Sequence, residues 1–198
     1  MCPARGDSIC SICCGREREV TIDCPGDCEH LVASRQYDLT RRNFDLAMLP
    51  FPEVKFQRGF AEKNAGLLVH LDHAVCQFAA DHREIVDTDV QAALQRLAET
   101  YRTQSTGIIY EHPPEYLPQR ELYESLKTAI TDYRKNEAQR LGMTTVHDSD
   151  IRDTLIFLTQ ICATHENGRP KGRAYLDLIR SQFPKEEFQK AGSNIVLL

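Results

Sequence analysis

The sequence predicts a mainly α-helical protein, in which a small N-terminal zinc-binding module precedes an antiparallel bundle of about five helices. Two observations lead to this prediction. Six of the eight cysteines fall within the first 28 residues, and apolar side chains after Pro52 recur every three or four positions, which is the period of an amphipathic helix. We therefore expect a cysteine-rich module over residues 1–34, a connector over 35–52 and a helical bundle domain over 53–198.

The composition is that of an ordinary soluble protein. The chain has 198 residues, of which 41% are hydrophobic and 27% charged, and its formal net charge is −5. This negative charge argues against a general polyanion binder, because nonspecific nucleic-acid affinity depends on a basic surface. No apolar run approaches the roughly 18 residues that cross a membrane, and the N-terminus has no apolar stretch typical of a secretory signal. We expect a cytoplasmic protein without a membrane partner.

Two short-spaced pairs of cysteines predict a structural zinc site. The pairs are Cys10-x2-Cys13 and Cys24-x3-Cys28, and four thiolates satisfy the tetrahedral preference of zinc. Clustered thiols without a secretory signal favour metal over disulfides. Because so short a segment buries little apolar surface, metal binding would supply its folding free energy. Polar and apolar residues alternate over 19–23, which predicts one short strand, as in a zinc ribbon or knuckle.

Cys2 and Cys14 leave the ligand set open. One zinc ion on the two pairs is the simpler interpretation, since adjacent residues such as Cys13 and Cys14 rarely bind the same ion. A second site built from Cys2, Cys14 and His30 is the alternative. An iron–sulfur cluster would also use four thiolates, and vicinal thiols are redox-active in some proteins.

The connector is predicted from charged and turn-forming residues between Arg35 and Pro52. It ends in Leu49-Pro50-Phe51-Pro52, where two prolines interrupt any helix because proline lacks a backbone N–H and clashes with the preceding turn. This segment should separate the cysteine module from the helices that follow.

Periodicity and terminal signals predict the first two helices of the bundle. An apolar stripe that starts at Phe56 predicts one long helix reaching about His82. Thr88 and Gln91 form a capping-box pattern, which marks the start of a second helix that runs to about Gly107.

The next two helices are predicted mainly from their ends. Pro118 suits the first turn of a third helix, and Gly142 is well placed to end it, since glycine adopts the left-handed conformation of a helix C-terminus. Asp148 or Ser149 can cap a fourth helix, which Asn167-Gly168 closes. Its apolar residues lie on more than one side, so it should be the most buried helix.

A fifth helix is predicted to begin at Pro170 and to stop at Pro184. Arg169, Lys171 and Arg173 surround its start, where free backbone amides and the helix dipole favour an anion. These three residues are therefore a candidate site for a phosphate or an acidic partner. The alternative interpretation is that they are simply solvated side chains of a connecting loop.

Catalytic motifs are scarce. The sequence contains no Gly-x-Ser-x-Gly elbow, phosphate-binding glycine loop or His-Glu-x-x-His. His70 and His73 share a helix face, but no Glu-x-x-His pattern completes a di-iron site. Cys76 and Cys162 lie in apolar helical patterns, where a cysteine is usually a small buried hydrophobe.

Three segments resemble a group of uncharacterised bacterial proteins in which a cysteine-rich module precedes a helical domain. They are Ile-Cys-Ser-Ile-Cys-Cys-Gly at 9–15, Arg-Glu-Val-Thr-Ile-Asp-Cys-Pro-Gly-Asp-Cys at 18–28 and Asn-Gly-Arg-Pro-Lys-Gly-Arg-Ala-Tyr-Leu-Asp at 167–177. In that group the first Cys-Pro follows a Cys-x2-Cys pair, whereas Cys2 here follows Met1 directly. The resemblance implies no activity, and it makes Cys2 the least secure ligand.

These patterns favour a non-enzymatic zinc-binding interaction or adaptor protein that recognises a protein partner. One alternative is a regulatory or nucleic-acid-associated protein, in which the module and Arg35, Arg41 and Arg42 contact phosphates. Against it, residues 1–49 hold six Arg and eight Asp or Glu, a balance of −2. The other alternative is an enzyme with a helical-bundle site at the two histidines.

Overall fold

The computed structural model describes residues 1–188 with the exception of 43–44, 105–106, 108–109 and 185. Within these residues the chain forms eight α-helices, one short 3-10 helix and no β-strand other than an isolated bridge. The prediction of a mainly α-helical protein is therefore confirmed. No helix in this part of the chain is long and apolar enough to span a membrane.

The cysteine-rich module contains two helices, α1 (Ser11–Glu17) and α2 (Glu29–Arg41). Cys10 caps α1, because its Sγ accepts the backbone N–H of Cys13 at 3.3 Å. Serine, threonine, aspartate and asparagine usually take this position, so the cysteine at the N-cap gave no sign that a helix begins here. α2 runs past residue 34, the expected end of the module, and therefore includes the first seven residues of the expected connector.

The strand expected over residues 19–23 does not form. The backbone N–H groups of Val20, Thr21 and Ile22 all donate to the carbonyl of Glu17 at 3.1 Å, which closes a turn instead. Glu19 within this turn has φ 53, a left-handed conformation that few non-glycine residues adopt. The described part of the module thus lacks the strand that suggested a zinc ribbon.

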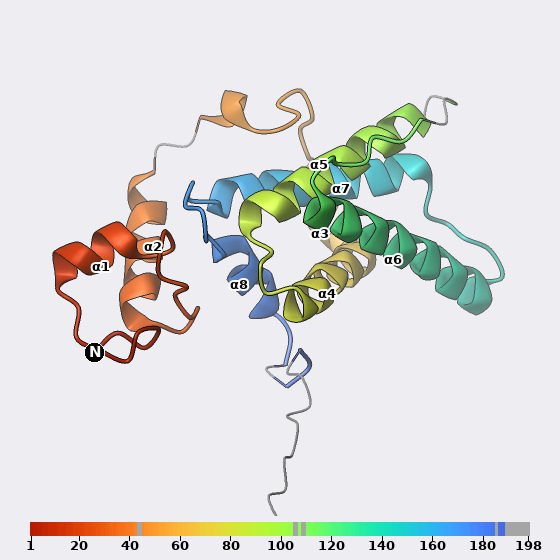
Figure 1. The fold of residues 1–198 in the computed structure, drawn as a ribbon. Helices are drawn as coiled ribbons and strands as arrows, with labels where there is room; N and C mark the ends of the chain where they lie inside the picture. Colours follow the sequence, from red (N-terminus) through yellow and green to blue (C-terminus); the bar gives the residue numbers. More distant parts are fainter. Residues whose placement is uncertain (43–44, 105–106, 108–109, 185, 189–198) are drawn as a thin grey trace, which may run out of the picture.

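A short 3-10 helix, η1 (Leu46–Met48), lies between the module and the bundle. The bundle then contains α3 (Phe60–Lys63), α4 (Ala65–Asp81), α5 (Asp87–Gln104), α6 (Leu117–Leu141), α7 (Asp148–His165) and α8 (Ala174–Arg180). The last ten residues of the expected bundle, 189–198, lie outside the described part. Figure 1 shows the module beside the bundle, which it approaches near α8.

Three helix boundaries in the bundle differ from the sequence prediction. The expected first helix is divided at Asn64 into α3 and α4. α7 is capped by His147, whose N–H donates to the Asp150 carboxylate at 3.0 Å. α8 begins at Ala174 instead of Pro170, because the N–H of Gly172 closes a turn on the carbonyl of Arg169 at 2.9 Å.

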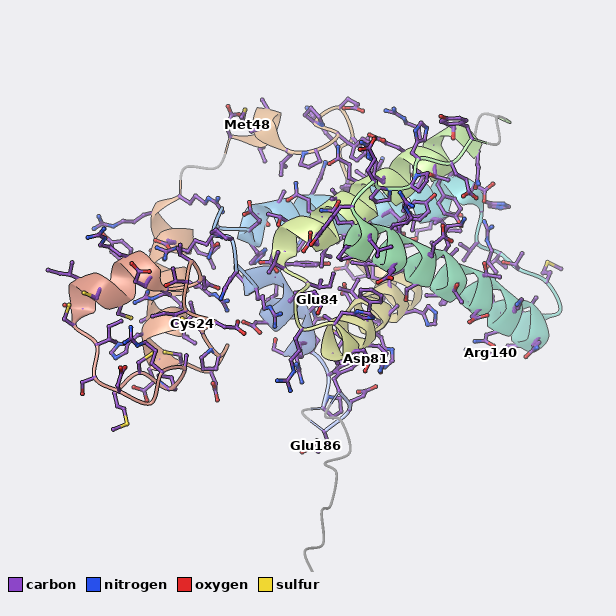
Figure 2. The ribbon with its side chains drawn as sticks, viewed as in Figure 1. Cys24, Met48, Asp81, Glu84, Arg140 and Glu186 are labelled. Carbon is purple, nitrogen blue, oxygen red and sulfur yellow. The ribbon has the colours of Figure 1, made fainter. Side chains whose placement is uncertain are left out.

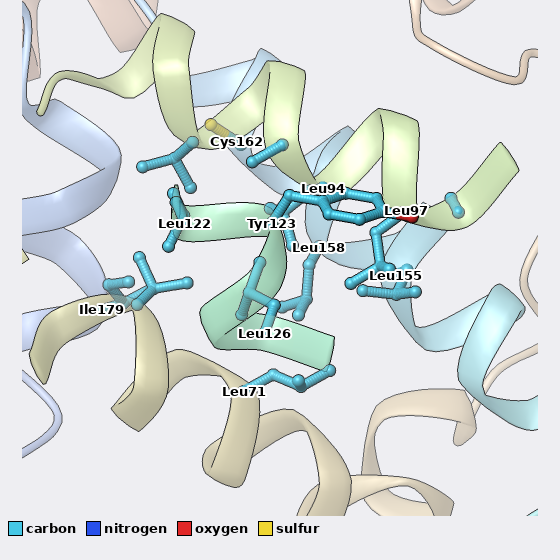
Figure 3. Packing of buried hydrophobic residues seen from close by; sticks show 14 of the residues in the cluster. Leu71, Leu94, Leu97, Leu122, Tyr123, Leu126, Leu155, Leu158, Cys162 and Ile179 are labelled. Atoms are coloured by element: carbon cyan, nitrogen blue, oxygen red, sulfur yellow. The ribbon is translucent and has the colours of Figure 1, made fainter. Parts of the chain in front are cut away.

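One apolar cluster joins the bundle helices (Figure 3). Each of α4 to α8 contributes a buried side chain, for example Leu71, Leu94, Leu126, Leu155 and Ile179. Burying such a side chain contributes roughly 1.5–3 kcal/mol, so the helices after residue 53 hold a core of their own. That they fold without the module remains a prediction.

The module buries much less apolar surface. Within residues 1–42, the buried apolar side chains are those of Cys2, Ile22 and Leu31. So small a core does not order a segment of this length in water. Other interactions must therefore define the module's conformation.

Candidate metal centre

Cysteines of the module surround one cavity of about 240 Å³. Its wall includes Cys2, Cys14, Cys24, Cys28 and His30. These residues come from the N-terminal loop, α1, the turn before α2 and the start of α2. Cys24 is labelled in Figure 2, within the module.

A tight N-terminal loop holds Cys2 at the cavity. The N–H of Cys2 donates to the carbonyl of Asp7 at 2.8 Å, and the carbonyl of Cys2 accepts the N–H of Gly6 at 2.9 Å. The side chains of Arg5 and Asp7 pair at 3.0 Å on the outside of this loop. Cys2 is consequently 7% exposed, although the sequence suggested that it was the least secure ligand.

Cys14 and Cys28 are held by helix termini. Cys14 lies in the first turn of α1, and the Arg18 guanidinium one turn later donates to its Sγ at 3.5 Å. Cys28 precedes α2, and its carbonyl accepts the first backbone bonds of that helix, from Leu31 and Val32 at 2.9 Å. Two helices therefore deliver one sulfur each to the same cavity.

Cys24 connects the cavity to the turn at Glu19. Burial raises the pKa of the Cys24 thiol, a backbone hydrogen bond from Glu19 opposes that rise, and the neighbouring sulfur of Cys28 adds to it. The two cysteines of the second predicted pair thus remain together, as their spacing indicated.

Cys10 and Cys13 stand apart from the cavity wall. Both are exposed to solvent. The hydrogen bond from the N–H of Cys13 lowers the pKa of the Cys10 thiol, and the hydrogen bond with Cys10 raises the pKa of the Cys13 thiol. The structure therefore brings Cys2 and Cys14, instead of the first predicted pair, to Cys24 and Cys28.

As the side chains stand, no three histidine, cysteine or carboxylate groups among the described residues are arranged to hold a metal ion. A ligand set therefore stays a prediction. The cavity identifies four cysteines that line one common space.

The module contacts the bundle through the residues that were predicted to bind an anion. Arg169 donates through both terminal nitrogens to the carbonyl of Gly15 at 3.2 Å and also donates to the carbonyl of Arg18. The ammonium of Lys171 donates to the carbonyl of Thr21 at 3.0 Å. These cations are engaged with module backbone and precede α8 instead of surrounding its first turn, so anion binding gains no support and stays an untested prediction.

Glu19 is the centre of this contact and is only 2% exposed. Its carboxylate accepts from Arg35 at 2.6 Å and from Asn167 at 2.8 Å, and its carbonyl accepts the N–H of Lys171 at 2.8 Å. Its carboxylate also lies 3.4 Å from the N–H of Arg173. A buried carboxylate needs such partners, because burying an unpaired charge is costly.

A second contact lies on the other side of Arg35, whose guanidinium pairs with Asp177 of α8 at 2.7 Å. Gly26 packs against the same carboxylate, and a Cβ placed there would meet Asp177 Oδ2 at 2.6 Å. The absence of a side chain at Gly26 is therefore what permits the close approach of the module to α8.

The three sequence segments at 9–15, 18–28 and 167–177 meet at this interface. Arg169 joins the third to the first through Gly15, and Lys171 joins it to the second through Glu19. No sequence pattern predicted this meeting. The available signal was local composition: the first two segments are rich in cysteine, and the third holds two glycines and three cationic side chains.

His70 and His73 do not converge. The Nε2 of His70 lies 2.9 Å from the carbonyl of Ala129 on α6, whereas that of His73 lies 3.0 Å from the carboxylate of Glu187. Each histidine therefore has a structural partner on a different element.

Two buried carboxylates in the bundle were missed by the sequence analysis. Asp72 accepts the Tyr175 hydroxyl at 3.2 Å, and burial raises its pKa to about 7. Asp87 accepts the N–H groups of Tyr175 and Leu176 at 2.9 and 3.1 Å, so it caps α8 from another helix, and burial raises its pKa to about 7. The bonds at these two carboxylates join positions far apart in sequence, which periodicity does not reveal.

Comparison with known protein families, curated proteins and solved structures finds no match to this chain.

Proposed function

We propose that this protein is a non-enzymatic interaction or adaptor protein whose N-terminal module is organised by one structural zinc ion. The observation that supports this most directly is the cavity bordered by Cys2, Cys14, Cys24 and Cys28. It lies in a module with three buried apolar side chains within residues 1–42, so metal binding would supply the missing folding free energy.

Zinc suits the available donors better than a hard cation does. Zinc ions and iron–sulfur clusters bind well to thiolates, whereas calcium and magnesium ions prefer oxygen ligands. Four thiolates on Zn²⁺ leave a net negative charge, and the Arg18 guanidinium lies beside one of the sulfurs. The cavity wall also includes His30, whose imidazole is a further possible zinc ligand.

A structural ion favours an interaction role over catalysis. A zinc ion with four protein ligands has no open position for a substrate. The two histidines of the bundle, His70 and His73, also bond to different elements. A zinc-organised module docked on a helical bundle instead offers a composite surface to a protein partner.

The metal can be tested with two adjacent residues. Protein purified under reducing conditions without added metal should contain about one equivalent of zinc by elemental analysis. Cys14→Ser should lose it, and Cys13→Ser should retain it. The opposite pattern would favour the ligand set that spacing alone suggested, with Cys10 and Cys13. Iron in place of zinc would indicate a cluster, and the absence of both metals would refute the proposal.

A further inference from the structure

A groove separates the module from the bundle. It has a volume of about 820 Å³ and is bordered by α2 on one side and by α8 and the end of α7 on the other. Besides Ala174, three larger apolar side chains line it, Val32 and Leu39 from α2 and Leu178 from α8. They remain 39%, 50% and 37% exposed, so a partner that covers all three would bury additional apolar surface.

The same groove has a positive formal charge. Its lining includes four arginines and two aspartates, which leaves two positive charges with His165 taken as neutral, although the whole chain has a net charge of −5. The arginines are Arg35, Arg41, Arg42 and Arg169, and the aspartates are Asp38 and Asp177.

The four arginines have internal contacts, and Arg42 donates to the carbonyls of Thr164 and Glu166 at the end of α7. Arg35 and Asp177 neutralise each other at 2.7 Å. Arg41 lies over the ring of Tyr37, 4.6 Å from its centroid, and Arg169 donates to backbone carbonyls. A ring and a carbonyl carry no full charge, so these contacts orient the two arginines without cancelling their field.

We propose that this groove binds an acidic amphipathic segment of another protein. The apolar side chains of that segment pack against Val32, Leu39 and Leu178, and its carboxylates face the arginines. This inference names the partner chemistry for the proposed interaction function and rests on it. Apolar anchors in a groove with opposite charges at the rim are the usual basis of peptide recognition by helical surfaces. A nucleic acid fits less well, because phosphates gain nothing from three aliphatic side chains.

Formation of the groove depends on docking of the module. The Arg35 guanidinium helps to hold α2 opposite α8, because it joins Glu19 at 2.6 Å and Asp177 at 2.7 Å. Glu19 in turn lies in the segment between Cys14 and Cys24. A partner that contacts both walls should therefore bind more weakly when the module loses its metal.

The partner chemistry can be tested by selecting from a random library of peptides of about 12 residues on the full-length protein, purified under reducing conditions without added metal. The proposal expects enrichment of sequences that combine Asp or Glu with Leu, Ile or Phe. Enrichment of basic or uncharged peptides, or no enrichment, would overturn it. Tight binding of single-stranded DNA that competes with the selected peptide would also overturn it.

Variants then test the location. Fluorescence anisotropy with an enriched peptide should show about tenfold weaker binding to Leu178→Asp. Binding to Arg41→Glu should be several-fold weaker, with a reduced dependence on salt. Met143→Asp is the matched control, because Met143 is an apolar residue 66% exposed beyond the groove, and it should bind as the wild type does. Equal binding to all three variants would place the peptide elsewhere and refute the groove.

Zinc measured on the same samples separates the two proposals. If the groove variants and the wild type hold zinc but no peptide is selected, the groove proposal fails and the metal centre stands. If an acidic peptide binds the groove of a protein without zinc or iron, the metal centre fails and the recognition surface stands.

Discussion

The bundle and the module are ordered by different forces. α4 to α8 share an apolar cluster that includes fully buried side chains such as Leu71, Leu94 and Leu126. The module instead buries few apolar side chains and is joined to the bundle by polar bonds, among them those of Glu19 with Asn167 and Lys171. Hydrophobic burial leaves a repeating pattern in the sequence, whereas contacts between single residues far apart in the chain leave none.

The largest effect should come from the bundle core. Leu94→Ala removes a fully buried leucine side chain and should lower the free energy of unfolding by about 3–4 kcal/mol, through lost burial and the remaining cavity. Thermal unfolding followed by circular dichroism would measure this loss. Zinc content below the melting transition should be unchanged.

A zinc loss in Leu94→Ala at a temperature where the helices remain folded would contradict the distinction between the two regions. It would mean that the metal centre and the core form one cooperative unit. Leu141→Ala is a matched control, since Leu141 is 60% exposed and should change stability by less than about 0.5 kcal/mol.

The contrast between the two regions also explains which parts could be predicted. The Gly142 terminus of α6 followed from the sequence and has φ 78, as a left-handed C-terminus requires. The start of α8 could not be predicted in this way, because Pro170 lies in a turn that presents Lys171 to the module. That turn depends on Glu19, and no local rule connects residues 152 positions apart.

The candidate site was predicted only in part. Spacing identified Cys24 and Cys28, which line the cavity together. It paired them with Cys10 and Cys13, because a short-spaced pair is the usual zinc-binding pattern. In the structure Cys10 caps α1, and the helix turns Cys14 toward the cavity. The periodicity of a helix that was not predicted therefore decided which cysteine faces inward.

A smaller effect is expected at the contact between the regions. Glu19→Ala removes the acceptor shared by Arg35 and Asn167 and should weaken docking of the module by about 2–3 kcal/mol, because it leaves buried donors unsatisfied. Hydrogen exchange at the amide of Lys171, which bonds to the Glu19 carbonyl at 2.8 Å, would measure this opening.

Asp27→Ala is the control for that experiment, since it removes an exposed carboxylate from the same module. Exchange at Lys171 should stay slow in Asp27→Ala, and bundle helicity should be retained in both variants. If Glu19→Ala exchanged as slowly as the wild type, the module would be held to the bundle by contacts other than those of Glu19.

The last effect concerns a charge inside the better-ordered region. Asp72 is 7% exposed, and burial raises its pKa to about 7, well above the unfolded value of 3.8. The folded protein therefore favours the protonated carboxyl, so this group stabilises the fold most below pH 3.8, and that contribution is lost as the pH rises toward about 7.

Asp72→Asn keeps an oxygen that can accept the Tyr175 hydroxyl but carries no charge at any pH. The variant should gain stability relative to the wild type as the pH rises from 4 to 7, by an amount on the order of a few kcal/mol for a pKa shift of this size, and the difference should then remain constant. Urea unfolding at a series of pH values would measure this difference. Asp87, whose pKa burial also raises to about 7, titrates in both proteins, so its contribution cancels in the comparison. A difference that shrinks over this range would mean that the Asp72 carboxylate has stronger partners in the fold than the Tyr175 hydroxyl.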